Sequence, residues 1–232
     1  MPYNNSSATT SPSSGSSSPS LEQAQAVTVL INSVVQQDSA DALNTLYDAL
    51  LNYSEQAINT KYKTAQGTKT LLEVIVDLYC ERIHSADQVQ VFFAVIERLL
   101  KNKANPNVLS VNNTPILLGI VAARINKKEA IEAIRDLLCL FYEYEADFSV
   151  KDKAGHNAVQ TAINYRNYGL IKLLHQLGCG VNAVNNGYGD RGFETALDLL
   201  QSKKGDAAAQ EMIPLMESLG AQSWQVLDSS SQ

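Results

Sequence analysis

The feature of this sequence that most restricts its fold is a succession of short helix patterns separated by recurring stops. In each pattern, apolar residues recur at steps of three and four, which places them on one face of an amphipathic α-helix. Such a face needs a neighbouring helix to cover it. The patterns occupy residues 24–35, 43–51, 71–79, 89–100, 116–121, 131–141, 159–163, 170–177, 195–200 and 212–219. Because these short helices come in pairs and strands are scarcely needed, the sequence predicts an all-α helical repeat protein.

The first 20 residues differ sharply in composition from the rest of the chain. Residues 1–20 are almost all Ser, Thr, Asn, Pro and Gly, which cannot bury enough apolar surface to offset the entropy lost on ordering. We expect a disordered tail there. Ser20 followed by Gln23 predicts a capping box at a helix start. The folded domain should therefore span residues 21–222, followed by a C-terminal tail over residues 223–232.

Composition and charge argue against several classes of partner. The 232 residues are 45% hydrophobic and carry a formal charge of −6, so no basic field attracts nucleic acid or anionic lipid. The best apolar run, residues 115–123, is shorter than the roughly 20 residues that span a bilayer. The N-terminus lacks the features of a usual secretory signal, and three scattered cysteines fit buried thiols in a reducing compartment. We expect a cytoplasmic monomer that binds neither nucleic acid nor membrane.

One segment has the features of a known repeat. Residues 152–162 begin with Asp and Gly in a turn and continue into a helix start, where Asn157 and Ala158 stand in the place of the usual Thr and Pro. Residues 170–177 then form a second helix pattern, which ends in Gly178–Asn182. This run resembles an ankyrin repeat, whose second helix leads into a Gly-Ala-Asp-Val-Asn exit.

Weaker copies of the same repeat recur along the chain. Echoes of the exit occupy residues 57–59, 103–107, 145–149 and 218–221, and residues 113–117 echo the helix start, with Thr114 as the expected N-cap. Only the step from Ser149 to Asn182 has the family's repeat length of about 33 residues. The surplus residues of the longer repeats fall around 77–86 and 124–135, where we expect lengthened helices.

The resemblance implies an ankyrin-repeat α-solenoid of about four degenerate repeats over residues 53–222, with short hairpin turns between repeats. The pair 21–52 has little of the signature and is expected to be an N-terminal helical cap. In ankyrin proteins, the projecting turns and the first helices form a concave surface that binds proteins. The resemblance therefore implies a protein-binding scaffold, adaptor or inhibitor that has no cofactor and is not an enzyme.

Two alternatives stay open. Divergent ankyrin repeats behind a Ser-rich tail also resemble effectors that intracellular bacteria deliver into host cells, which would place the protein in the host cytosol. It would act there on host proteins through the same surface. The other alternative is an enzyme with a cryptic site, because catalytic groups can converge from distant positions.

Two motifs suggest chemistry, and each has a simpler interpretation. Gly187, Gly189 and Gly192 match a dinucleotide-binding fingerprint, but the strand-helix-strand unit that this site needs cannot be completed. We interpret these glycines as positions of positive φ in an enlarged turn. Cys80 and His84 could share a helix face, but Cys80 belongs to a buried pattern and His84 to a helix end. No catalytic, metal or cofactor-binding residue is predicted.

Tyrosine and basic residues in the turns are the candidate binding residues. Tyrosine offers amphipathic contact area, and arginine offers a forked donor for carboxylates; both are enriched at binding hot spots. The predicted partner-binding residues are Tyr62, Lys63, Lys151, Lys153, His156, Tyr165, Tyr188 and Arg191. The basic bias of the turns predicts a partner protein with an acidic surface.

Overall fold

The computed structural model describes residues 21–37, 40–64, 67–84, 86–110, 112–125, 127–187 and 192–230. The Ser-rich segment 1–20, Tyr188, Gly189 and Arg191 lie outside these residues.

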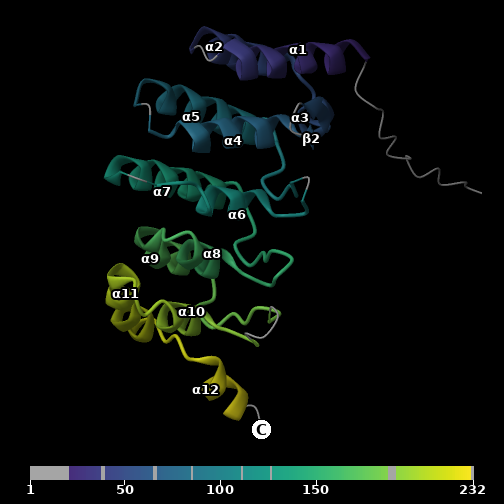
Figure 1. Cartoon of the computed structure of the whole chain (residues 1–232). Helices are drawn as coiled ribbons and strands as arrows, with labels where there is room; N and C mark the ends of the chain where they lie inside the picture. Colours follow the sequence, from purple (N-terminus) through teal and green to yellow (C-terminus); the bar gives the residue numbers. More distant parts are fainter. Residues whose placement is uncertain are drawn as a thin grey trace, which may run out of the picture.

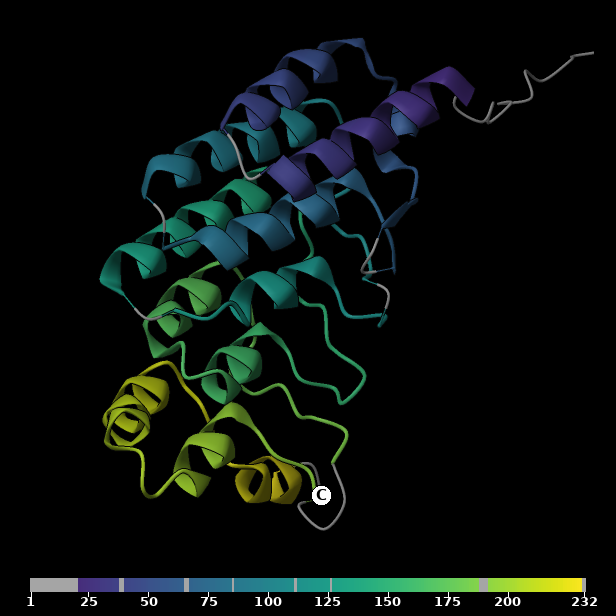
Figure 2. The ribbon, with the colours of Figure 1, turned by 45° about the horizontal axis from the view of Figure 1, so that its top comes forward.

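Helix pairs stack on one another along the described chain, and their first and second helices form two parallel rows (Figures 1 and 2). The pairs are α1 (Leu21–Gln37) with α2 (Ala40–Ala49), α4 (Leu71–Arg82) with α5 (Ala86–Lys101), α6 (Ile116–Val121) with α7 (Lys128–Glu143), α8 (Ala158–Asn164) with α9 (Ile171–Gln176), and α10 (Ala196–Ser202) with α11 (Ala207–Ser218). The shorter elements are η1 (Leu50–Asn52), α3 (Glu55–Asn59), β1 (Tyr62–Thr64), β2 (Gly67–Lys69), η2 (Tyr168–Leu170) and α12 (Trp224–Ser229). The predicted solenoid of paired helices is confirmed.

The core runs through the stack as a continuous layer between neighbouring pairs. Tyr79 of α4, Phe92 of α5, Phe141 of α7 and Leu174 of α9 are all almost completely buried. Burying a side chain of this size contributes about 1.5–3 kcal/mol, so each pair depends on its neighbours for stability. Helices α5 and α7 each have 16 residues, whereas α9 has 6, so part of the surplus length of the earlier repeats does lie in longer helices.

Loops project from one edge of the stack, at the right in Figure 1. We call them fingers A to D, defined by the described parts of residues 60–70, 104–115, 146–157 and 180–195. Each finger leads into the first helix of a pair. Finger A contains the antiparallel strands β1 and β2, in which Tyr62 lies opposite Lys69 and Thr64 opposite Gly67.

Three of the first helices begin with a capping box, in which the N-cap side chain and the third helical residue satisfy each other's backbone N–H groups. The pairs are Thr70 with Glu73 in α4, Asn157 with Gln160 in α8, and Thr195 with Asp198 in α10. These hydrogen bonds fix the direction in which the chain leaves each finger.

Helix α6 starts differently, and the prediction that Thr114 is its N-cap is wrong. Pro115 occupies the N-cap position with an extended ψ of 136°, and the helix has no side-chain cap hydrogen bond. The reason is that Pro115 pairs with Leu109 in an isolated β-bridge. Thr114 lies within finger B, where its carbonyl accepts a 2.9 Å hydrogen bond from the Ser110 N–H.

Asparagine side chains connect the exits of successive repeats. Asn59 accepts from the Asn105 N–H at 2.7 Å and donates to the Lys103 carbonyl at 2.8 Å. Asn107 likewise donates to the Glu145 carbonyl and accepts from the Asp147 N–H. Asn182 donates to the Gly220 carbonyl and accepts from the Gln222 N–H. We call this series the asparagine ladder.

The ladder is interrupted at Ser149, which occupies the corresponding place in the third exit. Its hydroxyl hydrogen-bonds to the Asp147 carboxylate at 2.6 Å, within the same finger. A thiol bond of 3.3 Å from Cys179 to the Phe148 carbonyl crosses this interface instead. Thiols are weak donors, so the link between these two exits is weaker than the ladder bonds between the others.

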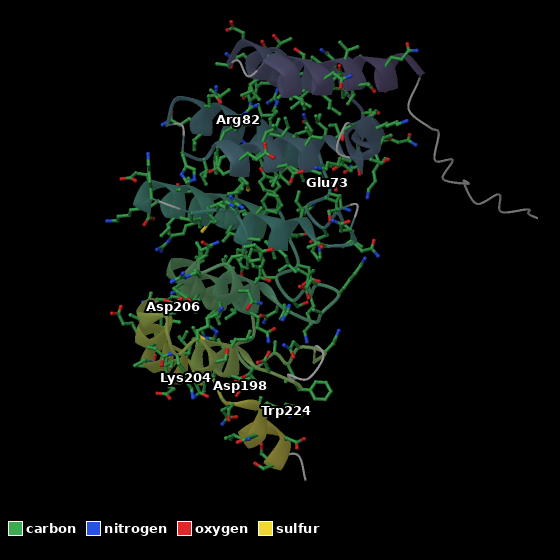
Figure 3. The ribbon with its side chains drawn as sticks, viewed as in Figure 1. Glu73, Arg82, Asp198, Lys204, Asp206 and Trp224 are labelled. Carbon is green, nitrogen blue, oxygen red and sulfur yellow. The ribbon has the colours of Figure 1, made fainter. Side chains whose placement is uncertain are left out.

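The last residues of the chain continue the helical structure. Residues 223–232, expected as a C-terminal tail, contain α12, which begins after Ser223. The Trp224 N–H donates to the Asp198 carboxylate at 2.8 Å. This bond attaches α12 to the last repeat, and Figure 3 shows Trp224 and Asp198 in this part of the molecule.

Candidate protein-binding surface

A groove lies between α4 and α6, on the side of the stack formed by the first helices. Its volume is about 800 Å³, which is within the range of roughly 300–1,000 Å³ typical of ligand sites in proteins. Finger B contributes Ser110, Asn112 and Pro115 to one end of it. The groove therefore joins a finger to the row of first helices.

The α4 wall of the groove is acidic. Glu73, Asp77 and Glu81 follow one another at four-residue steps, so they share one face of the helix. Asp77 forms a 2.5 Å ion pair with Lys69, which lies in the finger that precedes α4. Glu81 is exposed, so it remains accessible to a group that enters the groove.

Glu73 lies at the finger end of α4, as Figure 3 shows, and only 3% of the residue is exposed. One carboxylate oxygen accepts a 2.8 Å hydrogen bond from the Thr70 N–H in the capping box. The other oxygen, Oε1, is buried and has no hydrogen-bond partner among the described residues. A buried polar atom without a hydrogen-bond partner is uncommon in folded proteins. The described part of the chain therefore leaves one acceptor of Glu73 without a donor.

The α6 wall is open because Gly119 has no side chain. A Cβ atom built on Gly119 would meet no other atom within 4 Å, and the residue is exposed. Glycine in a helix interior costs roughly 0.5–1 kcal/mol relative to alanine. The groove therefore owes part of its width to a residue that is unfavourable for helix stability.

Tyr62 does not lie on this surface, which corrects the expectation that it is an interface anchor. The residue is 5% exposed, and its hydroxyl donates a 2.6 Å hydrogen bond to the Ala57 carbonyl. Burial raises the pKa of the phenol, so the hydroxyl keeps the proton that it donates. Tyr62 instead attaches finger A to α3.

The four predicted lysine and histidine residues all lie on the fingers, with different partners. Lys151 reaches across to finger D and donates to the Val184 carbonyl at 3.1 Å. His156 is half-buried, with Nδ1 3.2 Å from the Asp152 carboxylate. Lys63 and Lys153 are exposed. Lys151 is exposed as well, so fingers A and C carry accessible positive charge on Lys63, Lys151 and Lys153.

Tyr165 is 59% exposed, but it lies at the far edge of the stack. It follows α8, in the turn between the two helices of a pair. Its neighbour Arg166 forms a 3.0 Å ion pair with Asp206, which Figure 3 shows at the edge opposite the fingers. Tyr165 therefore lies apart from the finger residues and does not belong to the candidate surface.

The glycine-rich turn is described only at its two ends. Gly187 and Gly192 have φ values of 68° and 65°, as expected for glycines that permit a left-handed backbone. Val181–Val184 forms no strand. Within the described residues, the segment therefore lacks the strand that a dinucleotide fingerprint requires.

Cys80 and His84 both line the α4–α6 groove, but they have different surroundings. Burial raises the pKa of the Cys80 thiol to about 12, which disfavours the reactive thiolate at neutral pH. His84 Nε2 lies 3.1 Å from the Arg124 carbonyl. Among the described residues, no group of three His, Cys, Asp or Glu side chains is placed to hold a metal ion, and no helix is long and apolar enough to span a membrane.

Sequence reasoning missed Glu73, Asp77, Glu81 and Gly119 as surface-forming residues. The sequence does indicate the three carboxylates, because they recur at four-residue steps within an otherwise apolar helix. No sequence pattern indicates the groove, since its walls belong to two helices that are separated along the chain by α5 and finger B.

Comparisons with known proteins agree with the fold. No protein-family model matches the chain, and no curated protein matches it in sequence. Among solved structures, the chain is similar to an ankyrin repeat domain from Acinetobacter baumannii AYE, with 19% sequence identity and a TM-score of 0.52. The similarity covers 77% of this chain and 82% of that domain. The chain therefore has the ankyrin-repeat fold.

Proposed function

We propose that this protein is a scaffold, adaptor or inhibitor that binds another protein along the fingers and in the α4–α6 groove. The observation that carries the proposal is the groove itself, which lies beside finger B and is open at Gly119. Because the helix pairs are already stacked without a partner, binding requires little ordering of the chain.

The charges of the surface support a partner that presents acidic groups to the fingers and hydrogen-bond donors to the groove. Lys63 and Lys153 offer exposed ammonium groups on fingers A and C to acidic side chains, in line with the acidic partner surface that the sequence predicts. Glu81 and Asp77 line the groove and can accept hydrogen bonds from donor groups of the segment that enters it. The same surface would serve if the protein were delivered into a host cell as an effector.

Gly119 provides a direct test because it lines the groove and a Cβ atom there meets no other atom within 4 Å. Gly119→Trp should block the groove, whereas Gly119→Ala adds a single methyl group and should be neutral or slightly stabilising. Both variants should keep the wild-type circular dichroism spectrum. Affinity capture from native lysate, followed by quantitative mass spectrometry, should recover the partner with the wild type and the alanine variant. Recovery with the tryptophan variant should fall at least about tenfold.

The comparison of the two variants is the control. A partner recovered equally with all three proteins would remove the groove from the interface. Binding would then have to be sought on the fingers alone, with Lys63→Ala and Lys153→Ala as the next variants.

A further inference from the structure

A second groove lies on the opposite row of helices, between α5 and α7. Its volume is about 490 Å³. Val89, Phe93 and Glu97 line it from α5, while Asp136, Cys139, Leu140 and Glu143 line it from α7. None of these residues belongs to the fingers, so this groove is separate from the surface proposed above.

The floor of this groove is apolar. Val89 and Phe93 are partly buried, and Leu140 is 6% exposed. The Tyr79 ring also lines the groove, and its hydroxyl donates a 2.9 Å hydrogen bond to the Ala133 carbonyl. Because this hydroxyl already has a hydrogen-bond partner, the floor offers apolar surface to an incoming side chain.

The rim carries carboxylates on both sides, and those on the α7 side carry its net negative charge. Glu97, Asp136 and Glu143 line the groove, and its lining includes no Lys, Arg or His. Glu97 is paired with Lys101 at 2.6 Å, one helical turn further along α5. Asp136 and Glu143 are exposed on α7, at opposite ends of the stretch that contains Leu140. Their charges therefore flank the apolar floor.

We propose that the α5–α7 groove binds a basic amphipathic helical segment of a partner protein. An apolar side chain of that segment packs on Phe93 and Leu140. Lysine or arginine side chains one to two turns away pair with Asp136 and Glu143. The recognition is that of a helix in a groove, in which an apolar face gives affinity and flanking charges give orientation.

Charge also decides against the two other occupants that the chain itself could supply. Residues 1–20 contain no Lys, Arg or His, so the Ser-rich segment has no cation for this rim. A second copy of the chain has a formal charge of −6, and like charges disfavour its approach to an acidic groove. The complementary occupant is a basic segment of a different protein.

Cys139 gives a reporter within the groove. Its side chain is exposed, whereas burial raises the pKa of both Cys80 and Cys179 to about 12. An alkylating reagent near pH 8 should therefore modify Cys139 first, because the thiolate is the reactive form. An occupant of the groove should slow this modification.

The test uses the full chain and a synthetic peptide of about 18 residues, or about five helical turns, built from Leu and Lys so that one helical face is apolar. Affinity is measured by fluorescence anisotropy, and groove occupancy by the rate of Cys139 alkylation. We expect saturable binding, protection of Cys139, and no binding of the matched Leu and Glu peptide. A Ser and Lys peptide, which lacks the apolar face, should bind at least about tenfold more weakly.

Charge-matched variants locate the site. Asp136→Lys with Glu143→Lys should weaken binding of the Leu and Lys peptide at least about tenfold. Glu211→Lys with Glu217→Lys changes the net charge equally on exposed positions of α11 and should leave the affinity within about twofold. All variants should retain the wild-type circular dichroism spectrum and melting temperature.

Three results would overturn the proposal. These are equal loss of affinity in both double variants, unchanged Cys139 alkylation at saturating peptide, and binding of the Ser and Lys peptide as tight as that of the Leu and Lys peptide. Gly119→Trp separates this site from the proposed function, because blocking the α4–α6 groove should leave peptide binding unchanged.

Discussion

At Gly155, in finger C, two fingers touch through their backbones. Gly155 has a φ of +80°, and a Cβ atom there would lie 2.7 Å from the Asn186 side-chain oxygen and 2.8 Å from the Asn186 nitrogen. The Asn186 N–H donates a 2.8 Å hydrogen bond to the Ala154 carbonyl. Only glycine permits both this backbone conformation and this close approach.

Gly155→Ala should therefore destabilise the protein through two effects at once. Gly178 offers a matched control, since it has a φ of +97° but nothing within 4 Å of a Cβ. Gly178→Ala should cost about 1 kcal/mol from the left-handed backbone alone, and Gly155→Ala at least about 1 kcal/mol more from the contact. Urea unfolding of both variants measures the difference. Equal free energies of unfolding would mean that fingers C and D do not make this contact in solution.

At the scale of elements, the first helices of the repeats differ in how they begin. Asn157 accepts a 3.0 Å hydrogen bond from the Gln160 N–H and donates 2.7 Å to the Gly180 carbonyl, so it both caps α8 and holds finger D. Thr114 makes no cap bond to α6. Asn157 and Thr114 occupy similar positions before the first helices of their repeats, but only Asn157 caps its helix.

Asn157→Ala should lower the free energy of unfolding by about 1–3 kcal/mol, because it removes a cap and leaves a carbonyl without its donor. Thr114→Ala should change it by less than about 0.5 kcal/mol. Thermal or urea denaturation followed by circular dichroism distinguishes the two. A larger loss for Thr114→Ala than for Asn157→Ala would reverse the assignment of the caps.

Sequence patterns predicted the elements well because amphipathic helices depend on local periodicity. The helix pairs and the buried positions such as Leu174 follow from that periodicity alone. The surface was predicted less well. Tyr62 turns back to the Ala57 carbonyl, and Tyr165 lies at the far edge because it follows the first helix of a pair and not the second. These placements depend on how distant segments stack.

At the scale of the whole molecule, the asparagine ladder connects the repeats at every exit except the one at Ser149. Each complete step adds two hydrogen bonds between neighbouring repeats, one to an N–H and one to a carbonyl. At the interrupted step, the equivalent groups belong to Gly178 and Gly180. In a stack of repeats, stability is approximately a sum of the repeats and their nearest-neighbour interfaces, so the missing step removes the contribution that the ladder makes at the other exits.

Ser149→Asn should complete the ladder and raise the free energy of unfolding by about 0.5–1.5 kcal/mol, the net value of a typical hydrogen bond. Ser149→Ala is the control, because it removes the bond to Asp147 without supplying the new ones. Denaturant unfolding at constant pH compares the three proteins. If Ser149→Asn is no more stable than Ser149→Ala, the exits of the third and fourth repeats are not aligned as the ladder requires.

The interruption at Ser149 moves the connection between the third and fourth repeats from the exits to the fingers. The Asn186 N–H donates to the Ala154 carbonyl, the Asn157 side chain to the Gly180 carbonyl and Lys151 to the Val184 carbonyl, so fingers C and D are joined to each other. A partner that spans both fingers therefore meets two loops whose relative position is already set, and it can bind them as one rigid surface.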